Sequence, residues 1–356
     1  MKKMKNRIRN LLSIFAFAVA IIVILHIYAK IDTFKPNNFN RLILNNAISE
    51  EKNWQLAGNT WQISGISGDD IYLGNRKYLN LLMKCNIPKS DTHFIQIKLD
   101  QADTMHFNNA SLYINDTSFF LVDGNLRKIY KGDVGKWEAH LLQSDRSTFD
   151  LALPISNNTF TYRLLNRQDG FVLAKKSFDK DSFTQVNGLL QKQLDGVFCK
   201  DGQLLYDPYE SKIIYTYLYR NEFIVADSNL NLLYRGHTLD TTTHAKLKLS
   251  NRRKNGVVTI EAPPLIVSRK SCVSHGLLFI NSGLKADNEN REDFSHSSVV
   301  DIYDIKNGKY LSSFYIPYEN DVKFKDFKVN GDQVIALYDH ALKIYQLHLP
   351  GINLKS

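Results

Sequence analysis

The densest group of side chains that could bind a metal ion lies in the segment RGHTLDTTTHAK. It places His237, Asp240 and His244 within eight residues, with threonines between them. Imidazole and carboxylate groups are ligands for divalent first-row metal ions. The segment is a candidate metal site, and the alternative is a connecting loop whose polar groups form local hydrogen bonds. No motif in the sequence predicts a cofactor. A metal ion bound by His237, Asp240 and His244 is the exception that this segment allows.

A second group of candidates is aromatic. In the segment YDPYESKIIYTYLYR, Tyr215, Tyr217 and Tyr219 alternate along the chain and therefore share one face of a strand. Such a row either packs against a neighbouring sheet or forms an aromatic wall for a peptide or glycan partner. Two histidines, His275 and His296, flank the polar and acidic segment 284–297 and are further candidates for a partner surface. That segment is also a candidate sensor of a soluble ligand.

Established catalytic motifs are missing from the sequence. It contains no G-x-S-x-G elbow, no H-E-x-x-H pair and no P-loop. The three cysteines, Cys85, Cys199 and Cys272, are widely separated and form no C-x-x-C pair, so they are either buried thiols or one disulfide plus one free thiol. The sequence leaves catalysis undecided and favours a protein that is not an enzyme.

Short apolar runs rich in strand-forming residues recur along the chain. The segment RNEFIVADSNLNLLYRG is the clearest of them, and similar units begin near positions 69, 117, 169, 221, 275 and 331. Their separations of 48 to 56 residues suit the roughly 40–50 residues of a propeller repeat. The spacing predicts an all-β fold, a six-bladed β-propeller over residues 54–350, with five or seven blades and a pair of β-sandwiches as alternatives.

The turns between these runs carry aspartate or Asn-Gly pairs, which tolerate the backbone of tight turns. Asp227 and Asp123 occupy the same place in their units, so we interpret both as turn residues and not as catalytic acids. A weak helical period appears only over residues 41–51, where a short helix before the propeller is expected.

The units FIVADSNLNLLYRG and FFLVDGNLRKIYKG resemble those of TolB/NHL-like six-bladed propellers, in particular the divergent membrane-anchored versions of bacterial envelopes. The resemblance covers most of residues 54–350. It lies in the repeat length and in the order apolar run, aspartate, apolar run. It implies a propeller fold, and no functional residue is carried over by it.

The N-terminal segment has its own character. Basic residues dominate positions 1–10, and residues 11–29 are almost entirely apolar, close to the about 20 residues that cross a bilayer. We expect a cytoplasmic tail over 1–10, an uncleaved transmembrane anchor over 11–29 and a stalk over 30–53, with a cleaved signal peptide as the alternative. The positive-inside rule then places the propeller in the periplasm of a bacterium, anchored to the inner membrane, before a C-terminal tail over 351–356.

Charge gives no support for a nucleic-acid partner. The first thirty residues carry +6 of the net charge of +9, so the high isoelectric point is largely a property of this segment. We interpret the basic cluster at Arg252, Arg253 and Lys254 as part of a solvent-exposed loop.

Two functions remain. The first is a membrane-anchored propeller that binds or scaffolds a protein partner in the bacterial envelope. The alternative is a propeller enzyme with a metal or organic cofactor near the central axis, such as a lactonase-like hydrolase or a quinoprotein-like oxidoreductase. The alternative requires His, Asp, Glu or Asn side chains that converge from at least three blades.

Overall fold

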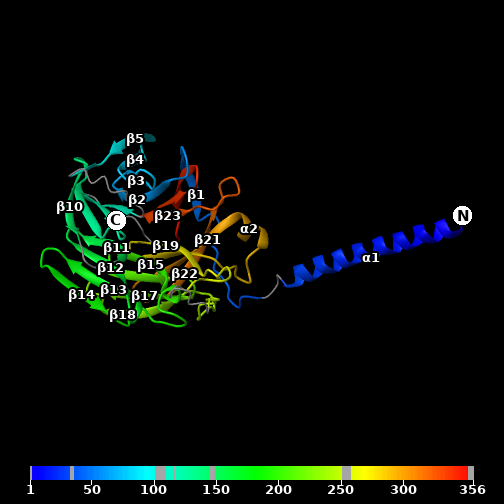
Figure 1. The fold of residues 1–356 in the computed structure, drawn as a ribbon. Coiled ribbons are helices and arrows are strands. Elements are labelled where there is room, and N and C mark those ends of the chain that lie inside the picture. The colour runs from blue at the N-terminus through cyan, green and yellow to red at the C-terminus, as the bar shows by residue number, and fades with distance from the viewer. Residues whose placement is uncertain are drawn as a thin grey trace.

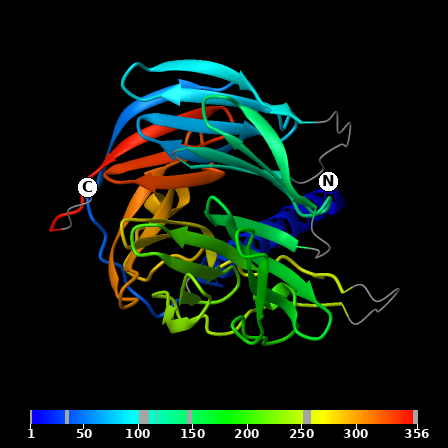
Figure 2. The same cartoon turned by 90° about the vertical axis from the view of Figure 1, so that its left-hand side faces the viewer.

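The computed structural model describes residues 2–32, 36–100, 110–115, 117–144, 149–250 and 258–351. Within these ranges, the strands form four antiparallel sheets of four strands and one sheet of nine strands, in which a parallel contact joins two further four-stranded groups. These groups surround a central axis (Figures 1 and 2), which is the architecture of a β-propeller. The predicted all-β propeller fold is confirmed at this level. The cluster Arg252, Arg253 and Lys254 and the tail after residue 351 lie outside the described residues.

Each blade runs through consecutive strands, with the innermost strand first. The blades after the N-terminal region contain β2 (Trp61–Ser67), β3 (Asp70–Asn75), β4 (Leu81–Asn86) and β5 (Asp91–Gln96); then β7 (Ala110–Ile114), β8 (Ser118–Asp123), β9 (Lys128–Asp133) and β10 (Glu138–Ser144); then β11 (Phe149–Ser156), β12 (Thr159–Asn166), β13 (Gly170–Ser177) and β14 (Ser182–Val186). They continue with β15 (Gly202–Asp207), β16 (Lys212–Tyr217), β17 (Glu222–Asp227) and β18 (Leu232–His237); then β19 (Ser268–Ser274), β20 (Leu277–Ser282), β21 (Ser297–Asp304) and β22 (Tyr310–Pro317). The short strand β6 (Lys98–Leu99) pairs in parallel with β10.

The last blade joins the two ends of the propeller. It contains β23 (Asp326–Asn330), β24 (Gln333–Leu337), β25 (Ala341–Leu347) and, as its outer strand, β1 (Ile48–Gln55). β1 pairs antiparallel with β25 from Ile48 opposite Leu347 to Gln55 opposite Ala341. The expected helix over 41–51 is therefore wrong at its C-terminal part, because β25 offers an edge whose backbone groups bond to this segment. β1 also begins inside the segment assigned to a stalk.

The hydrophobic core is divided into clusters, each of which lies between two successive blades. Phe120 of β8, for example, contacts Phe160 of β12 edge to face, with ring centroids 5.2 Å apart. Leu73 of β3 and Ile344 of β25 belong to the cluster that joins the last blade to the first. Comparable clusters fill the other spaces between neighbours, so every blade buries both of its faces against the next.

The repeat units do not mark equivalent places in the blades. Positions 69, 117, 275 and 331 lie just before the second strand of their blades, whereas 169 and 221 lie just before the third strand. The second and third strands of a blade are both buried and follow similar turns, so their sequences give the same pattern. The even spacing therefore mixes two kinds of position, although the propeller fold that it predicted is present.

The aspartates in these units are turn residues, as the sequence predicted. The Asp227 Oδ1 atom accepts hydrogen bonds from the backbone N–H groups of Asn229 and Asn231, at 2.8 and 2.9 Å. Asp123, which is fully buried, accepts one from the N–H of Leu126 at 2.9 Å. Both carboxylates thus replace backbone partners inside a turn.

Helix α1 (Lys2–Asp32) projects away from the propeller (Figure 1). Within the residues that the structure describes, no helix has the length and apolar character that a membrane crossing requires. The predicted transmembrane anchor over 11–29 is therefore not supported.

Candidate functional site

The predicted metal-binding trio does not assemble into a site. Asp240 is buried, accepts hydrogen bonds from the Thr238 hydroxyl at 2.6 Å and from the Thr242 N–H at 2.9 Å, and so closes a local turn. His237 and His244 are exposed, and their Nδ1 atoms lie near the Asn221 carbonyl and the Thr243 hydroxyl. In the described ranges, no group of three or more His, Cys, Asp or Glu side chains is arranged to hold a metal ion.

The tyrosine row lies inside the protein and cannot form an exposed partner surface. Tyr215 and Tyr217 pack edge to face, with ring centroids 5.3 Å apart, in the cluster between the third and fourth blades. The Tyr215 hydroxyl donates to the Lys200 carbonyl at 2.6 Å and accepts from Arg163. Burial raises the pKa of Tyr215 well above its ordinary value. Tyr219 is also buried, so the packing interpretation of this row is the correct one.

The two histidines that flank the acidic segment lie in different settings. His275 occupies the turn between β19 and β20 with a positive φ of 49°, and its ring lies 5.5 Å from that of Tyr209. His296 ends the short helix α2 (Arg291–His296) and is exposed. The structure gives neither of them a role beyond these local contacts.

The acidic segment binds the chain itself. The Asp287 carboxylate accepts hydrogen bonds from the backbone N–H groups of Asn37 and Asn38, at 2.7 and 2.9 Å. The Asn288 amide bonds to both the N–H and the carbonyl of Arg41, at 3.0 and 2.8 Å. These contacts fix the N-terminal segment against the fifth blade.

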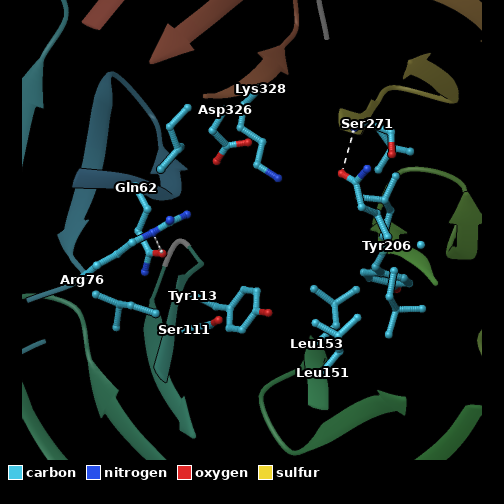
Figure 3. Close-up of a pocket in the computed structure, with 17 residues that line it drawn as sticks. Gln62, Arg76, Ser111, Tyr113, Leu151, Leu153, Tyr206, Ser271, Asp326 and Lys328 are labelled. Atoms are coloured by element: carbon cyan, nitrogen blue, oxygen red, sulfur yellow. Dashed lines mark hydrogen bonds between the residues drawn. The ribbon is translucent and has the colours of Figure 1, made fainter. Parts of the chain in front are cut away.

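A cavity lined by charged, polar and apolar side chains lies on the propeller axis. It has a volume of about 340 Å³ and is lined by residues of all the innermost strands, β2, β7, β11, β15, β19 and β23 (Figure 3). Ligand sites in proteins span about 300–1,000 Å³, so this cavity accommodates a small group and no large organic cofactor. Because each innermost strand comes from a different blade, the cavity exists only when the ring is complete.

One side of the cavity is charged. Asp326 and Lys328 alternate along β23 and point into it, and Arg76 approaches from the end of β3 (Figure 3). The Arg76 Nε atom donates to Gln62 Oε1 at 3.3 Å. The Lys328 ammonium has neither a hydrogen bond nor an ion pair with any residue of the described ranges, so it is available to a ligand.

A further cation stands beside this side of the cavity. Lys325 donates from Nζ to the Asn59 carbonyl at 2.8 Å. Burial lowers the pKa of Lys325, and the charge of Arg76 lowers it further, against the opposite effect of Asp339. Desolvation is thus the main cause of the lowered pKa, and the nearby carboxylates of Asp339 and Asp326 oppose it.

The opposite side of the cavity is apolar. Leu151 and Leu153 of β11 face Asp326 and Lys328 across the cavity (Figure 3), and Leu204 and Leu205 of β15 extend this wall. β23 and β11 belong to blades that lie across the axis from each other. The cavity is thus amphipathic, with charge on one side and leucine side chains on the other.

Polar side chains between these two sides are fixed in place. The Gln203 Oε1 atom accepts from the Ser271 N–H at 3.0 Å, and the Ser271 hydroxyl lies 2.7 Å from that of Thr216. Tyr113 points its hydroxyl toward the centre (Figure 3), and burial raises its pKa. These groups can donate or accept hydrogen bonds without rearrangement of the walls.

None of the site candidates that the sequence suggests lines this cavity. The repeat pattern of the sequence is strong in the second and third strands of the blades and in the turns before them. The innermost strands mix polar with apolar residues, as in DFKVN and ASLYI, and these two share no common motif. A signal available in the sequence was the pair Asp326 and Lys328, two charges two residues apart within the predicted propeller.

No protein-family model matches the chain, and no curated protein matches it either. Its fold is similar to that of a member of the DUF4221 family from Bacteroides vulgatus, with 9% identity, a TM-score of 0.48 and coverage of 85% of this chain and 97% of that one. It is also similar to the β-propeller domain of Myceliophteria thermophila Cps50 (Swd1), with 9% identity, a TM-score of 0.45 and coverage of 85% and 100%.

A third similar structure is that of a nidogen/laminin complex, with 11% identity, a TM-score of 0.41 and coverage of 72% of this chain and 81% of that one. None of the three similarities identifies a function for this chain. None is described as a TolB or NHL protein, so that part of the sequence resemblance stays a prediction.

Proposed function

We propose that this chain is a six-bladed β-propeller that acts as a protein-binding module, and that the mouth of its axial cavity is the surface that engages the partner. The observation that carries the proposal is the amphipathic wall of the cavity. A cationic side, fixed hydrogen-bonding groups and leucine side chains together suit recognition of a polypeptide segment.

The composition of the wall favours binding over the alternative, a propeller enzyme. A metal or catalytic centre on the axis needs His, Asp, Glu or Asn side chains from several blades. Among the described residues that line the cavity, Asp326 is the single carboxylate, and the lining includes no His, Cys or Glu. The assignment of the partner to the bacterial envelope depended on the N-terminal segment alone and stays a prediction.

Photo-cross-linking at the mouth of the cavity tests the proposed function. A photoreactive residue at Gln203 should cross-link a discrete protein partner when the chain is expressed in a native-like host. Leu153→Asp should abolish the cross-link, because a carboxylate would stand in the apolar wall. Lys89→Glu, an exposed change in the turn between β4 and β5, should leave it intact.

The melting temperatures of the three proteins would show that each is folded. A cross-link that persists in Leu153→Asp, or that is absent from the unmodified chain, would overturn the proposed function.

A further inference from the structure

We propose that the axial cavity binds the C-terminal residue of a polypeptide, with its free carboxylate at Lys328 and Arg76, its peptide N–H at Asp326 and an apolar side chain against the leucine wall. The inference rests on the proposed function and deepens it, since it names the group of the partner that enters the cavity.

The argument begins with charge. Two cations and one carboxylate point into the cavity, and the Lys328 ammonium is bound to no residue of the described ranges. A lysine left in this state in a partly enclosed space favours an anion that supplies the missing acceptor.

The position of Asp326 selects among anions. Asp326 and Lys328 lie two residues apart on one strand face, so a carboxylate acceptor and an ammonium donor stand next to each other. A C-terminal residue carries the two complementary groups on the two sides of one Cα atom. Its N–H can donate to Asp326, and its carboxylate can accept from Lys328. A phosphate or sulfate lacks the N–H donor, so it has no hydrogen bond to Asp326 that would offset the repulsion between the two negative charges.

The apolar wall selects the side chain. Leu151 and Leu153 lie across the cavity from the charged pair, so a ligand held at Lys328 directs its remaining surface toward leucine. An aspartate or glutamate side chain within a polypeptide would satisfy Lys328 and leave this wall without a partner. A C-terminal leucine, isoleucine, valine or phenylalanine satisfies both sides, and its volume suits a cavity of about 340 Å³.

Calorimetric titration of the full-length chain with three probes tests the inference. The probes are an N-acetylated tripeptide that ends in leucine, the same peptide with a C-terminal amide, and free leucine. We expect the free acid to bind and the amide to bind at least about tenfold more weakly, because the amide lacks the charge that pairs with Lys328. Free leucine lacks the two preceding residues of the peptide and their contacts at the mouth of the cavity, so we expect it to bind more weakly, although its ammonium would pair with Asp326.

Variants assign the effect to the named residues. Lys328→Met and Arg76→Met should each weaken binding of the acid at least about tenfold and change binding of the amide little. Lys89→Met removes an exposed lysine in the β4–β5 turn and should bind like the unchanged protein. Lys328 and Arg76 are not fully buried, so loss of either charge leaves the core intact, and thermal melting would check this.

Three results would overturn the inference: no saturable binding of the acid, equal affinity for acid and amide, or an equal loss of both in Lys328→Met. If free leucine bound as tightly as the peptide, the cavity would be a site for free amino acids, and the inference that its ligand is a polypeptide would be wrong. If the titration gave one of these results while the photo-cross-link at Gln203 persisted, the proposed function would still hold and only this inference would be wrong. If peptide binding and the photo-cross-link were both absent, the inference and the proposed function would both be wrong.

Discussion

Arg41 and Asp301 are 260 residues apart in the chain, and their side chains form a bidentate ion pair inside the protein. The Nε atom of Arg41 lies 2.7 Å from Asp301 Oδ1, and its Nη2 atom lies 3.0 Å from Oδ2. Glu289 adds a third contact, 2.5 Å from Arg41 Nη1. All three side chains are almost completely buried. The pair therefore connects the N-terminal segment to the fifth blade without competition from water.

The first prediction concerns this ion pair. Arg41→Met would leave the Asp301 and Glu289 carboxylates buried without their cation, and we expect it to lower the free energy of unfolding by about 3–5 kcal/mol. Urea denaturation followed by circular dichroism measures the change. Lys98→Met removes an exposed partner of Glu138 and should change stability very little. Equal stability of Arg41→Met and the unchanged protein would contradict the structure at this point.

The second prediction concerns closure of the ring. Deletion of residues 1–55 removes β1, exposes the edge of β25 and takes away Trp54, which is buried in the cluster that joins the last blade to the first. We expect a loss of at least about 3 kcal/mol and association through the open edge.

Deletion of residues 1–35 is the matched control for that experiment. It removes α1 and keeps both β1 and the contacts of Arg41. Thermal melting and size-exclusion chromatography should show a monomer-like, stable propeller for this shorter deletion. Similar behaviour of the two truncated proteins would show that β1 does not close the ring.

The third prediction concerns pH. Cys85 and Cys272 are buried free thiols, and burial raises the pKa of each from 9.0 to about 12. The folded protein therefore keeps protons that the unfolded chain loses above pH 9. The stabilising contribution is complete below pH 9 and is lost as pH rises toward 12, by up to about 1.4 kcal/mol per pH unit for each thiol.

Urea denaturation at pH 8, 9, 10 and 11 measures this dependence. The variant Cys85→Ala/Cys272→Ala should show a shallower decline, because lysines and tyrosines titrate in both proteins and the thiols only in one. Parallel declines in the two proteins would mean that the thiols contribute nothing to the dependence.

The fourth prediction concerns the turn after β17. Asp227→Ala removes the acceptor of the Asn229 and Asn231 N–H groups and of the Asn231 side-chain amide. We expect a loss of about 1–2 kcal/mol in the free energy of unfolding, with no change in peptide binding. Asp69→Ala, whose exposed carboxylate has no hydrogen bond within the described ranges, should be neutral. Loss of binding in Asp227→Ala at unchanged stability would give this residue a functional role.

The sequence was informative where structure depends on neighbours in the chain. Apolar runs such as FIVAD and turn residues such as Asp227 predicted strands and hairpins, because a strand alternates its faces every two residues and a turn needs particular side chains. The same locality caused the errors. Tyr215 and Tyr217 share one face of β16 as expected, whereas Tyr219 lies beyond the end of that strand. Whether a blade or solvent covers such a face depends on residues far away in the chain.

By itself the sequence determined an all-β chain, its recurring turn-and-strand units and the turn role of its aspartates, since these follow from local pattern and composition. The tertiary structure alone decided that β1 completes the last blade, that Arg41 pairs with Asp301, and that Asp326 and Lys328 face Leu151 and Leu153 across an axial cavity. The reason is that these contacts join residues that only a closed ring brings together. The energy of such long-range contacts leaves no periodic trace in the chain.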